Sequence, residues 1–259
     1  MSDSKGTALV TGASRGIGYE LARLFAGTGY DVVLTARTES DLREAADYFA
    51  ERFGAETHVI PTDLSDPDGP RQLYDECRER DVEVDVLVNN AGFGTHGPFV
   101  ENDLETELDQ IQVNVTAPTH LTRLFLSDMA DRGDGKVLNV ASSAAFAPGP
   151  SMAVYYATKS YLLSFSEAVA EEVRQRGITV TALCPGPVDT SFTERAGNDG
   201  MNLYRIDRHP RTVAREGYRG LMRGDTVVVP GLGMKAAYLA AKHAPRSVSR
   251  KVAGWLNRA

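Results

Sequence analysis

A repeated alternation between short apolar segments and longer amphipathic segments constrains the fold of this chain more than any other feature. Strands that are apolar along their whole length are typical of sheets buried on both faces. Strands that alternate with helices predict βαβ units, a parallel sheet and right-handed crossovers. We therefore expect an α/β fold with a doubly wound parallel sheet of about seven strands and helices on both faces.

The printed sequence gives the expected boundaries of these elements. The expected strands are 7–11, 31–36, 56–61, 84–89, 136–140, 178–183 and 226–229. The expected helices are 15–27, 39–53, a helix capped by Ser65 with Pro67 in its first turn, 104–130, and 153–176 closed by Gly177. The 259 residues contain no linker-like change of composition, so we expect a single domain over 1–259.

Composition excludes several classes of function. The net charge of −7 disfavours a nucleic-acid partner, because phosphate binding needs a basic surface. Two distant cysteines give no disulfide framework, which fits a cytoplasmic location. Residues 1–6 are polar, and no run of about 20 apolar residues occurs, so we expect neither a secretory signal nor a membrane span. The five histidines lack metal-ligand spacing, and we expect no metal site.

A glycine-rich turn follows the first expected strand. It reads TGASRGIG over 11–18, with a GxxxGxG spacing that differs from the common GxGxxG of dinucleotide sites. Glycines permit a sharp turn and a close approach of backbone to phosphate, and the start of the next helix favours an anion. The alternative is a glycine-rich turn without a ligand. We expect cofactor contacts from Gly12, Ser14, Arg15, Gly16, Ile17 and Gly18.

The end of the second strand indicates which dinucleotide binds. An acidic residue at this place usually holds the ribose 2′-hydroxyl of NAD, whereas an arginine accommodates the 2′-phosphate of NADP. Here the strand ends in Thr35, Ala36 and Arg37, and Arg15 adds a second cation. We therefore expect NADP(H) to be preferred over NAD(H), the alternative being two solvated surface arginines.

Tyr155 and Lys159 lie four residues apart on an expected helix and so share one face. A phenol with a pKa near 10 is a poor base, and a neighbouring ammonium lowers that pKa. Such a phenol can give a proton to a carbonyl oxygen or take one from an alcohol. A YxxxK pattern alone is a common chance match, but this one follows both the glycine turn and Asn89-Asn90-Ala91-Gly92.

Together these pieces resemble the short-chain dehydrogenase/reductase family, in its compact branch with a single Rossmann-like domain. The resemblance covers about residues 7–190 in the expected order, and its pieces are highly specific as a set. The matching pieces are TGASRGIG at 11–18, Asp63-Leu64, NNAG at 89–92, Asn114, Ser142, YYATK at 155–159, and Pro185-Gly186 followed by Val188 and Thr190.

The resemblance implies a role for each matching residue. Tyr155 is the acid/base, Lys159 holds the nicotinamide ribose and tunes Tyr155, and Ser142 hydrogen-bonds the substrate oxygen. Asn114 holds a water that links Lys159 to solvent. The remaining implied cofactor contacts are Asp63 and Leu64 at the adenine, Asn90, Ala91 and Gly92 along the floor, and Pro185, Gly186, Val188 and Thr190 around the nicotinamide.

Two neighbouring residues compete for these roles. Ser143 is an alternative to Ser142, although the family's spacing to the tyrosine selects Ser142. Tyr156 is an alternative to Tyr155, but only Tyr155 has a lysine at i+4. A shift of one residue turns a side chain by about 100° on a helix, so we expect Tyr156 to serve in packing.

The chain then divides into three parts. Residues 7–190 would bind cofactor and catalyse, 191–225 would form a substrate loop, and 226–259 would hold the last strand and a basic tail. The segment 192–209 is either a mobile lid or an ordered surface loop. Just past NNAG, the residues expected to wall the substrate pocket are Phe93, His96 and Phe99.

The tail from Thr226 onward has six Lys or Arg and no Asp or Glu, so the rest of the chain carries −13. Val248, Val252, Trp255 and Leu256 recur at helical spacing beside cations. This pattern fits an amphipathic helix in peripheral contact with a membrane, which would suit a lipophilic substrate. The alternative is a tail that packs on its own domain or on a partner subunit.

The hypothesis for function is an NADP(H)-dependent oxidoreductase that interconverts a ketone or 3-oxo compound and a secondary alcohol. One alternative is an NADP(H)-binding redox sensor without turnover. Another is a nicotinamide-dependent epimerase or dehydratase, although related enzymes of that kind are usually longer. The resemblance also implies a homodimer or homotetramer, with contacts through the helices around 104–130 and 153–176.

Overall fold

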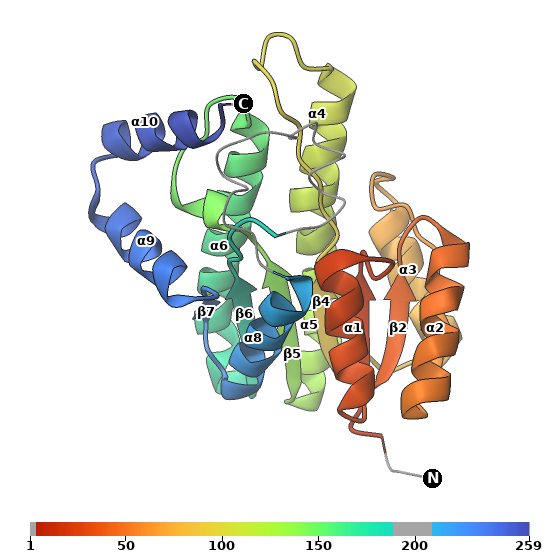
Figure 1. Cartoon of the computed structure of the whole chain (residues 1–259). Helices are drawn as coiled ribbons and strands as arrows, with labels where there is room; N and C mark the ends of the chain where they lie inside the picture. The colour runs from red at the N-terminus through yellow and green to blue at the C-terminus, as the bar shows by residue number, and fades with distance from the viewer. Residues whose placement is uncertain (1–3, 189–208, 259) are drawn as a thin grey trace.

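The fold is a three-layer α/β sandwich (Figure 1). It was examined as a computed structural model that describes residues 4–188 and 209–258. Within those residues, seven parallel strands form one sheet in the order β3-β2-β1-β4-β5-β6-β7. The strands are β1 Thr7–Thr11, β2 Asp31–Thr35, β3 Thr57–Val59, β4 Val86–Asn89, β5 Gly135–Val140, β6 Ile178–Leu183 and β7 Val227–Val228.

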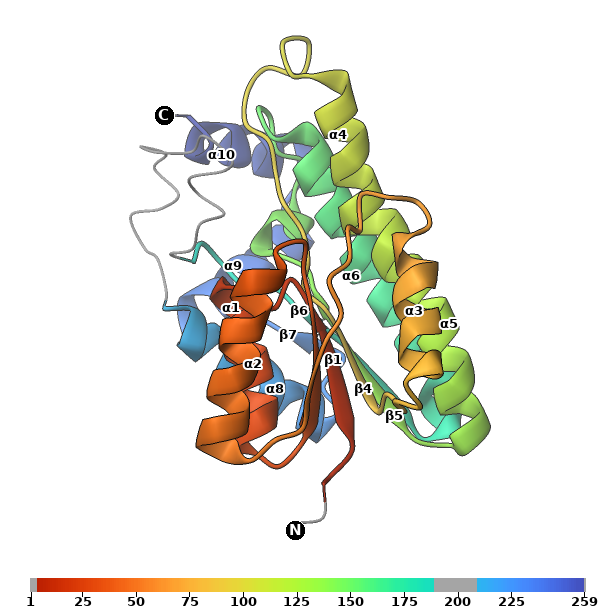
Figure 2. The same ribbon diagram turned by 90° about the vertical axis from the view of Figure 1, so that its right-hand side faces the viewer.

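Helices cover both faces of the sheet, as Figure 2 shows in a view along its edge. On one face lie α1 Gly16–Gly27, α2 Glu39–Phe53 and α8 Pro210–Arg223. On the other lie α3 Gly69–Glu79, α4 Leu104–Ile111, α5 Ala117–Arg132 and α6 Ala153–Val173. The prediction of a doubly wound, Rossmann-like sheet is confirmed.

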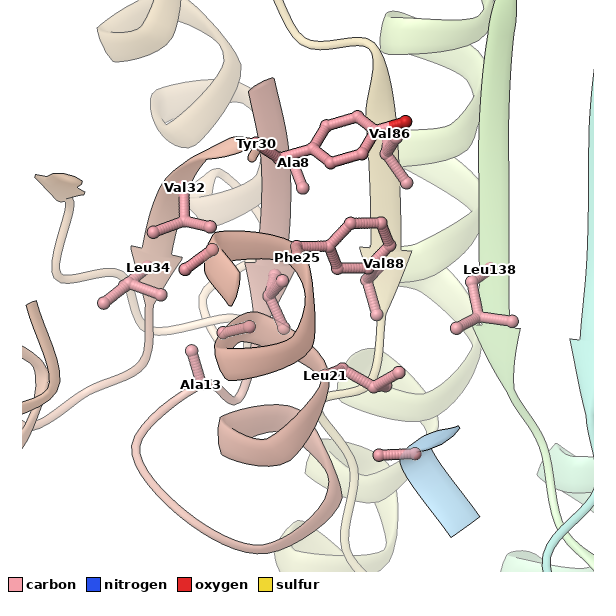
Figure 3. Close-up of a cluster of buried hydrophobic side chains, with 14 of the residues drawn as sticks. Ala8, Ala13, Leu21, Phe25, Tyr30, Val32, Leu34, Val86, Val88 and Leu138 are labelled. Atoms are coloured by element: carbon pink, nitrogen blue, oxygen red, sulfur yellow. The ribbon is translucent and has the colours of Figure 1, made fainter. Parts of the chain in front are cut away.

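The strands are buried because their side chains pack into two separate cores. In β1, Ala8 and Val10 belong to one cluster, and Leu9 belongs to the other. Figure 3 shows the first cluster, where Phe25 of α1 points toward Val88 of β4. This two-sided burial explains why the strands read as continuous apolar runs in the sequence.

The order of the strands reverses between β1 and β4. β1 pairs with β2 on one side and with β4 on the other. Strands β2 and β3 therefore extend the sheet in one direction from β1, and strands β4 to β7 extend it in the other. In sheets of this kind the crevice outside the carboxyl ends of the strands, at the reversal, is the usual place for a ligand.

Helix α3 begins later than predicted. The predicted cap, Ser65, instead gives its backbone N–H and its hydroxyl to the carboxylate of Asp63, at 3.0 and 2.7 Å. A turn follows in which the N–H of Asp68 bonds the carboxylate of Asp66 at 2.9 Å. The helix therefore starts at Gly69, with Pro70 in its first turn where the sequence analysis placed Pro67.

The helix predicted over 104–130 is interrupted. Between α4 and α5 lies a π-helical turn, Gln112–Thr116, with the buried Asn114 at its centre. Single π-turns inside α-helices are rare and occur frequently at functional sites. The hydrophobic spacing continues through the turn, so the sequence periodicity gave no sign of it.

The other predicted boundaries differ mainly at strand and helix ends. The helix predicted over 153–176 is α6 followed by a 3-10 turn, Arg174–Arg176. Gly177 ends it in the left-handed conformation, as predicted, with φ of +75°. A Cβ at this glycine would collide with the backbone carbonyl oxygen of Gly133.

Two further helices follow β7. They are α9 Leu232–His243 and α10 Arg246–Leu256, which we call the C-terminal arm. Figure 1 shows the arm at the β7 edge of the molecule, with α10 at the same end as α4. Among the helices of the described residues, none combines the length and the apolar character needed to cross a bilayer.

Gly177 and Gly54 allow a matched test of this packing. Both end a helix in the left-handed conformation, but a Cβ at Gly54 would meet nothing within 4 Å. Gly54→Ala should lower the free energy of unfolding by about 1–2 kcal/mol through backbone strain alone. Gly177→Ala should lower it further, because the Gly133 carbonyl must also move. Equal losses in urea denaturation would contradict this assignment.

Candidate active site

A cavity of about 1190 Å³ lies at the carboxyl ends of the strands. It brings together residues that are far apart in the sequence, from the glycine turn after β1 to the segment after β6. The sequence-predicted residues that line it are Gly12, Ser14, Arg15, Gly16, Ile17, Arg37, Asp63, Leu64, Asn90, Ala91, Gly92, Ser142, Tyr155, Lys159, Pro185, Gly186 and Val188.

Two of the described site residues predicted from the sequence do not line this cavity. Gly18 lies behind the glycine turn, where a Cβ would collide with the carbonyl oxygen of Gly12. Asn114 lies behind the cavity floor and is 1% exposed. Thr190, and residues 192–208 of the predicted lid segment 192–209, fall outside the described residues.

The glycine turn forms a cradle for an anion. Gly12 has φ of +65°, and a Cβ there would lie 2.9 Å from the side-chain nitrogen of Asn90. Arg15 is the N-cap residue of α1 and makes no side-chain hydrogen bond to the first turn. The N–H groups at the start of α1 are therefore not used by a capping side chain, and they favour a phosphate. These features fit the pyrophosphate of a dinucleotide.

The NNAG segment is fixed to β1 by Thr11, a residue for which the sequence predicted no role of its own. The Thr11 hydroxyl accepts hydrogen bonds from the backbone N–H groups of Asn90 and Ala91, both at 2.9 Å, and donates to the Val88 carbonyl at 3.3 Å. The side-chain amide of Asn90 donates to the carbonyl oxygens of Thr11 and Gly12, at 2.9 and 3.2 Å. The cavity floor and the glycine turn are thus one hydrogen-bonded unit.

Lys159 lies at the bottom of the cavity and is 5% exposed. Its Nζ donates to the carbonyl oxygen of Val140 at 2.9 Å and lies 5.9 Å from the centre of the Tyr155 ring. Burial lowers the pKa of Lys159 to about 8, and Cys184 opposes this effect in part. The group is still a cation at neutral pH, and it stands close to the phenol.

Asn114 connects the π-helical turn to the tyrosine helix. Its side-chain nitrogen donates to the carbonyl oxygen of Phe93 at 2.9 Å and to the hydroxyl of Thr158 at 3.1 Å, and that hydroxyl donates to the Tyr155 carbonyl at 2.8 Å. A Cβ on Gly92 would lie 2.9 Å from Asn114 Oδ1. Asn114 therefore positions the backbone around the site, and the water link implied for it stays a prediction.

Ser142 and Ser143 both line the cavity. The Ser142 hydroxyl oxygen accepts a hydrogen bond from the N–H of Ala144 at 3.1 Å, which leaves its proton directed elsewhere. The backbone N–H of Ser143 donates to the Pro185 carbonyl at 2.7 Å. The choice of Ser142 over Ser143 stays a prediction from the family's spacing.

The two predicted arginines line the far end of the cavity, together with Thr38. Arg15 makes a long, exposed ion pair with Asp41, at 3.7 Å. Burial pushes the pKa of Asp63 upward, but two hydrogen bonds from Ser65 and the nearby Arg37 outweigh it and leave that pKa below its usual value. The cations therefore share this end of the cavity with one ionised carboxylate.

Of the three residues predicted to wall the substrate pocket, one lines the cavity. Phe93 does so. His96 instead bonds the backbone carbonyl oxygen of Asn257 through Nε2, at 2.9 Å. Phe99 is 59% exposed and lies away from the cavity lining. The C-terminal arm contributes much of the apolar lining, and this place at the cavity was not predicted from the sequence.

Comparison with known proteins decides the family. A profile described as short chain dehydrogenase matches residues 6–200. The chain belongs to the short-chain dehydrogenase family. This match confirms the resemblance inferred from the motifs.

Two relatives of this short-chain dehydrogenase are named as 3-oxoacyl reductases. Very-long-chain 3-oxoacyl-CoA reductase of Rattus norvegicus is 35% identical over 193 residues, 72% of this chain and 61% of the rat protein. The 3-oxoacyl-(acyl-carrier-protein) reductase FabG of Escherichia coli is 32% identical over 192 residues, 74% of this chain and 77% of that protein. This chain thus spans about three fifths of the length of the rat relative.

Solved structures agree with the fold. A short-chain dehydrogenase from Sphingobium yanoikuyae in complex with NADPH has a TM-score of 0.85 and 31% identity, covering 94% of each chain. A bulky-bulky ketone specific alcohol dehydrogenase from Comamonas testosteroni has a TM-score of 0.81 and 28% identity, covering 94% of this chain and 93% of that one.

Lys159→Met should make this short-chain dehydrogenase more stable at neutral pH when no ligand is bound. The pKa of Lys159 is about 8 in the folded protein and 10.5 ordinarily, so the unfolded chain holds the proton more tightly. Below about 8 both states are protonated and the folded state bears the full cost of burial, about 3 kcal/mol at most. Methionine removes that cost.

The pH dependence separates this effect from a general change in packing. As pH rises from about 8 to 10.5, the wild-type group loses its proton in the folded state first, and its cost disappears. The stability advantage of Lys159→Met, measured by urea denaturation of the ligand-free proteins, should therefore shrink over that range. An advantage that does not change with pH would contradict the assignment.

Proposed function

We propose that this protein is an NADP(H)-dependent oxidoreductase that interconverts a ketone or 3-oxo compound and a secondary alcohol. One observation carries the proposal: Tyr155, Lys159 and Ser142 line the same cavity as the glycine turn and the two arginines. A proton donor, a cation beside it and a dinucleotide cradle therefore meet in one site. The family supports the same reaction class.

The protein's own groups handle the proton. In reduction, Tyr155 gives its phenolic proton to the substrate oxygen, and Ser142 holds that oxygen by a hydrogen bond. The Lys159 ammonium stabilises the phenolate that remains, at low dielectric because Lys159 is buried. When bound, the nicotinamide supplies the hydride. Oxidation of an alcohol reverses the movement of the proton.

Arg15, Arg37 and Thr38 support a preference for NADP(H). They line the end of the cavity that follows β1 and β2, where a 2′-phosphate would need charge-assisted hydrogen bonds. The relative from Sphingobium yanoikuyae was solved with NADPH, which agrees. We favour reduction as the direction in the cell, and 3-oxoacyl reductases among the relatives point the same way.

The proposal extends to assembly and location. A homodimer or homotetramer through α4, α5 and α6 fits the exposed apolar side chains of Leu108, Ile111 and Tyr161. A cytoplasmic location stays a prediction. The C-terminal arm packs against its own domain through Asn257, which favours a tail that packs on its own domain over one that contacts a membrane. Peripheral membrane contact through the basic C-terminal tail also stays a prediction.

Tyr155→Phe should lower kcat by about 10²–10⁴-fold or more, because it removes the proton donor. Binding of NADPH, measured by fluorescence titration, should change little. Tyr161→Phe is a matched control on the same helix, since the Tyr161 hydroxyl meets Thr119 outside the cavity. Near-normal turnover in Tyr155→Phe would overturn the mechanism.

Consumption of one NADPH for each ketone reduced would separate a reductase from a redox sensor and from an epimerase or dehydratase.

Arg37→Asp should shift preference from NADPH toward NADH. Loss of a charge-assisted bond to the 2′-phosphate should lower kcat/KM for NADPH by about 10- to 100-fold. The value for NADH should fall less or rise, because the new carboxylate can accept from a ribose hydroxyl. Arg52→Asp, at the far end of α2, is the control. Unchanged kinetics with both cofactors would refute the role of Arg37.

A further inference from the structure

The C-terminal arm forms an apolar wall along the cavity. The wall begins beside Gly186, where a Cβ would lie 3.1 Å from the sulfur of Met234. It continues to α10, where Ala253 packs in one buried cluster with Met152 and Tyr156, and Tyr155 packs against that cluster. The wall therefore borders the catalytic residues. Its main lining residues are Met234, Ala237, Ala241, Val248, Val252 and Leu256.

The wall can make apolar contacts with a substrate and almost no polar ones. Ser249 is the one residue with a polar side chain among the described lining residues of the arm. Val248 and Val252 are 51% and 52% exposed although they line the cavity, so their apolar area stays in water until a ligand covers it. Among the described residues that line the cavity away from its nucleotide end, the acidic one is Asp109, which is exposed on α4.

Asn257 fastens the arm over the cavity. This residue directly follows α10 and is 1% exposed. Its side-chain oxygen accepts from the Tyr156 hydroxyl, its side-chain nitrogen donates to the Pro150 carbonyl, and its backbone oxygen meets His96 Nε2, each at 2.9 Å. One buried amide thus joins the arm to α6 and to two loops, and we call this set of bonds the latch.

From this wall and its latch, and resting on the proposed function, we infer the class of substrate. The arm binds a ketone with an extended, uncharged hydrocarbon body, which lies against Val248, Val252 and Leu256. These three residues fall at intervals of four on α10 and so make one continuous stripe. Asn257 is a positioning residue, because it holds that stripe in place and does not line the cavity itself.

The first test varies the length of the substrate. With straight-chain methyl ketones and NADPH, kcat/KM should rise about fourfold for each added methylene, equivalent to about 0.8 kcal/mol, until the stripe is covered. The gain should appear mainly in KM. A ketone of equal length that ends in a carboxylate should lose that gain. A kcat/KM that does not depend on chain length would overturn the inference.

A charge placed on the stripe gives a second test. Val252→Asp should abolish the chain-length dependence, because a carboxylate would then need to be desolvated by the hydrocarbon. Ser247→Asp is a matched control that adds the same charge to an exposed position of α10 outside the cavity lining. The control should keep the wild-type dependence. The same loss in both variants would mean that charge acts at a distance and that the stripe does not touch substrate.

The latch is tested through the same dependence. Asn257→Ala should flatten the dependence of KM on chain length while leaving the Kd for NADPH unchanged. Tyr156→Phe should flatten it in the same direction, and the double variant should add little to Asn257→Ala, because the bond between Tyr156 and Asn257 is already lost in that variant. If Asn257→Ala lowered the thermal stability but left the chain-length dependence intact, the residue would be structural and the latch role would fail.

Binding measurements keep this inference separate from the proposed function. Calorimetry with straight-chain secondary alcohols and the NADPH complex, a pair between which no hydride can pass, reports the Kd without any turnover, and the Kd should fall about fourfold per methylene. Absence of NADPH oxidation with every ketone would sink the proposed function. Turnover, or alcohol binding, without dependence on chain length would sink this inference alone.

Discussion

The rest of the site depends on the burial of one positive charge, the ammonium group of Lys159, where β5 ends. A buried cation is costly unless polar groups surround it, and here the Val140 carbonyl supplies one. The neighbouring backbone must come close, and for that reason the floor residue beside it is Gly92. The tyrosine ring, Asn114 and the NNAG floor are therefore arranged around a single charge whose position is set by the sheet.

Much of this arrangement was predictable because it follows from local rules. Apolar strands alternating with amphipathic helices require a parallel sheet, and the carboxyl ends of such strands meet at one edge. The glycine turn, Arg37 and Lys159 each follow a recognisable strand or share a helix face with a partner, so sequence spacing placed them in one cavity. The positive φ of Gly177 likewise follows from its place after a long helix.

The parts that sequence could not supply depend on contacts between distant segments or on competition between nearby ones. Ser65 was a plausible helix cap until Asp63, two residues earlier, took both its N–H and its hydroxyl. The π-helical turn at Asn114 leaves the hydrophobic spacing intact, so no periodicity reports it. Asn257 bonds Tyr156 across 101 positions, and nothing in the tail's own sequence indicates that partner.

The nucleotide-lining residues and the C-terminal arm border one continuous cavity, and this has a thermodynamic consequence. Each ligand becomes part of the other's surroundings, since whichever arrives first replaces water along the shared boundary. Under the proposed function, linkage then requires symmetry: the factor by which the dinucleotide raises affinity for the ketone equals the factor by which the ketone raises affinity for the dinucleotide. A substitution in the arm that weakens binding of the organic ligand therefore also changes the affinity for the nucleotide while that ligand is present. No residue of the arm needs to belong to the phosphate cradle for this to happen.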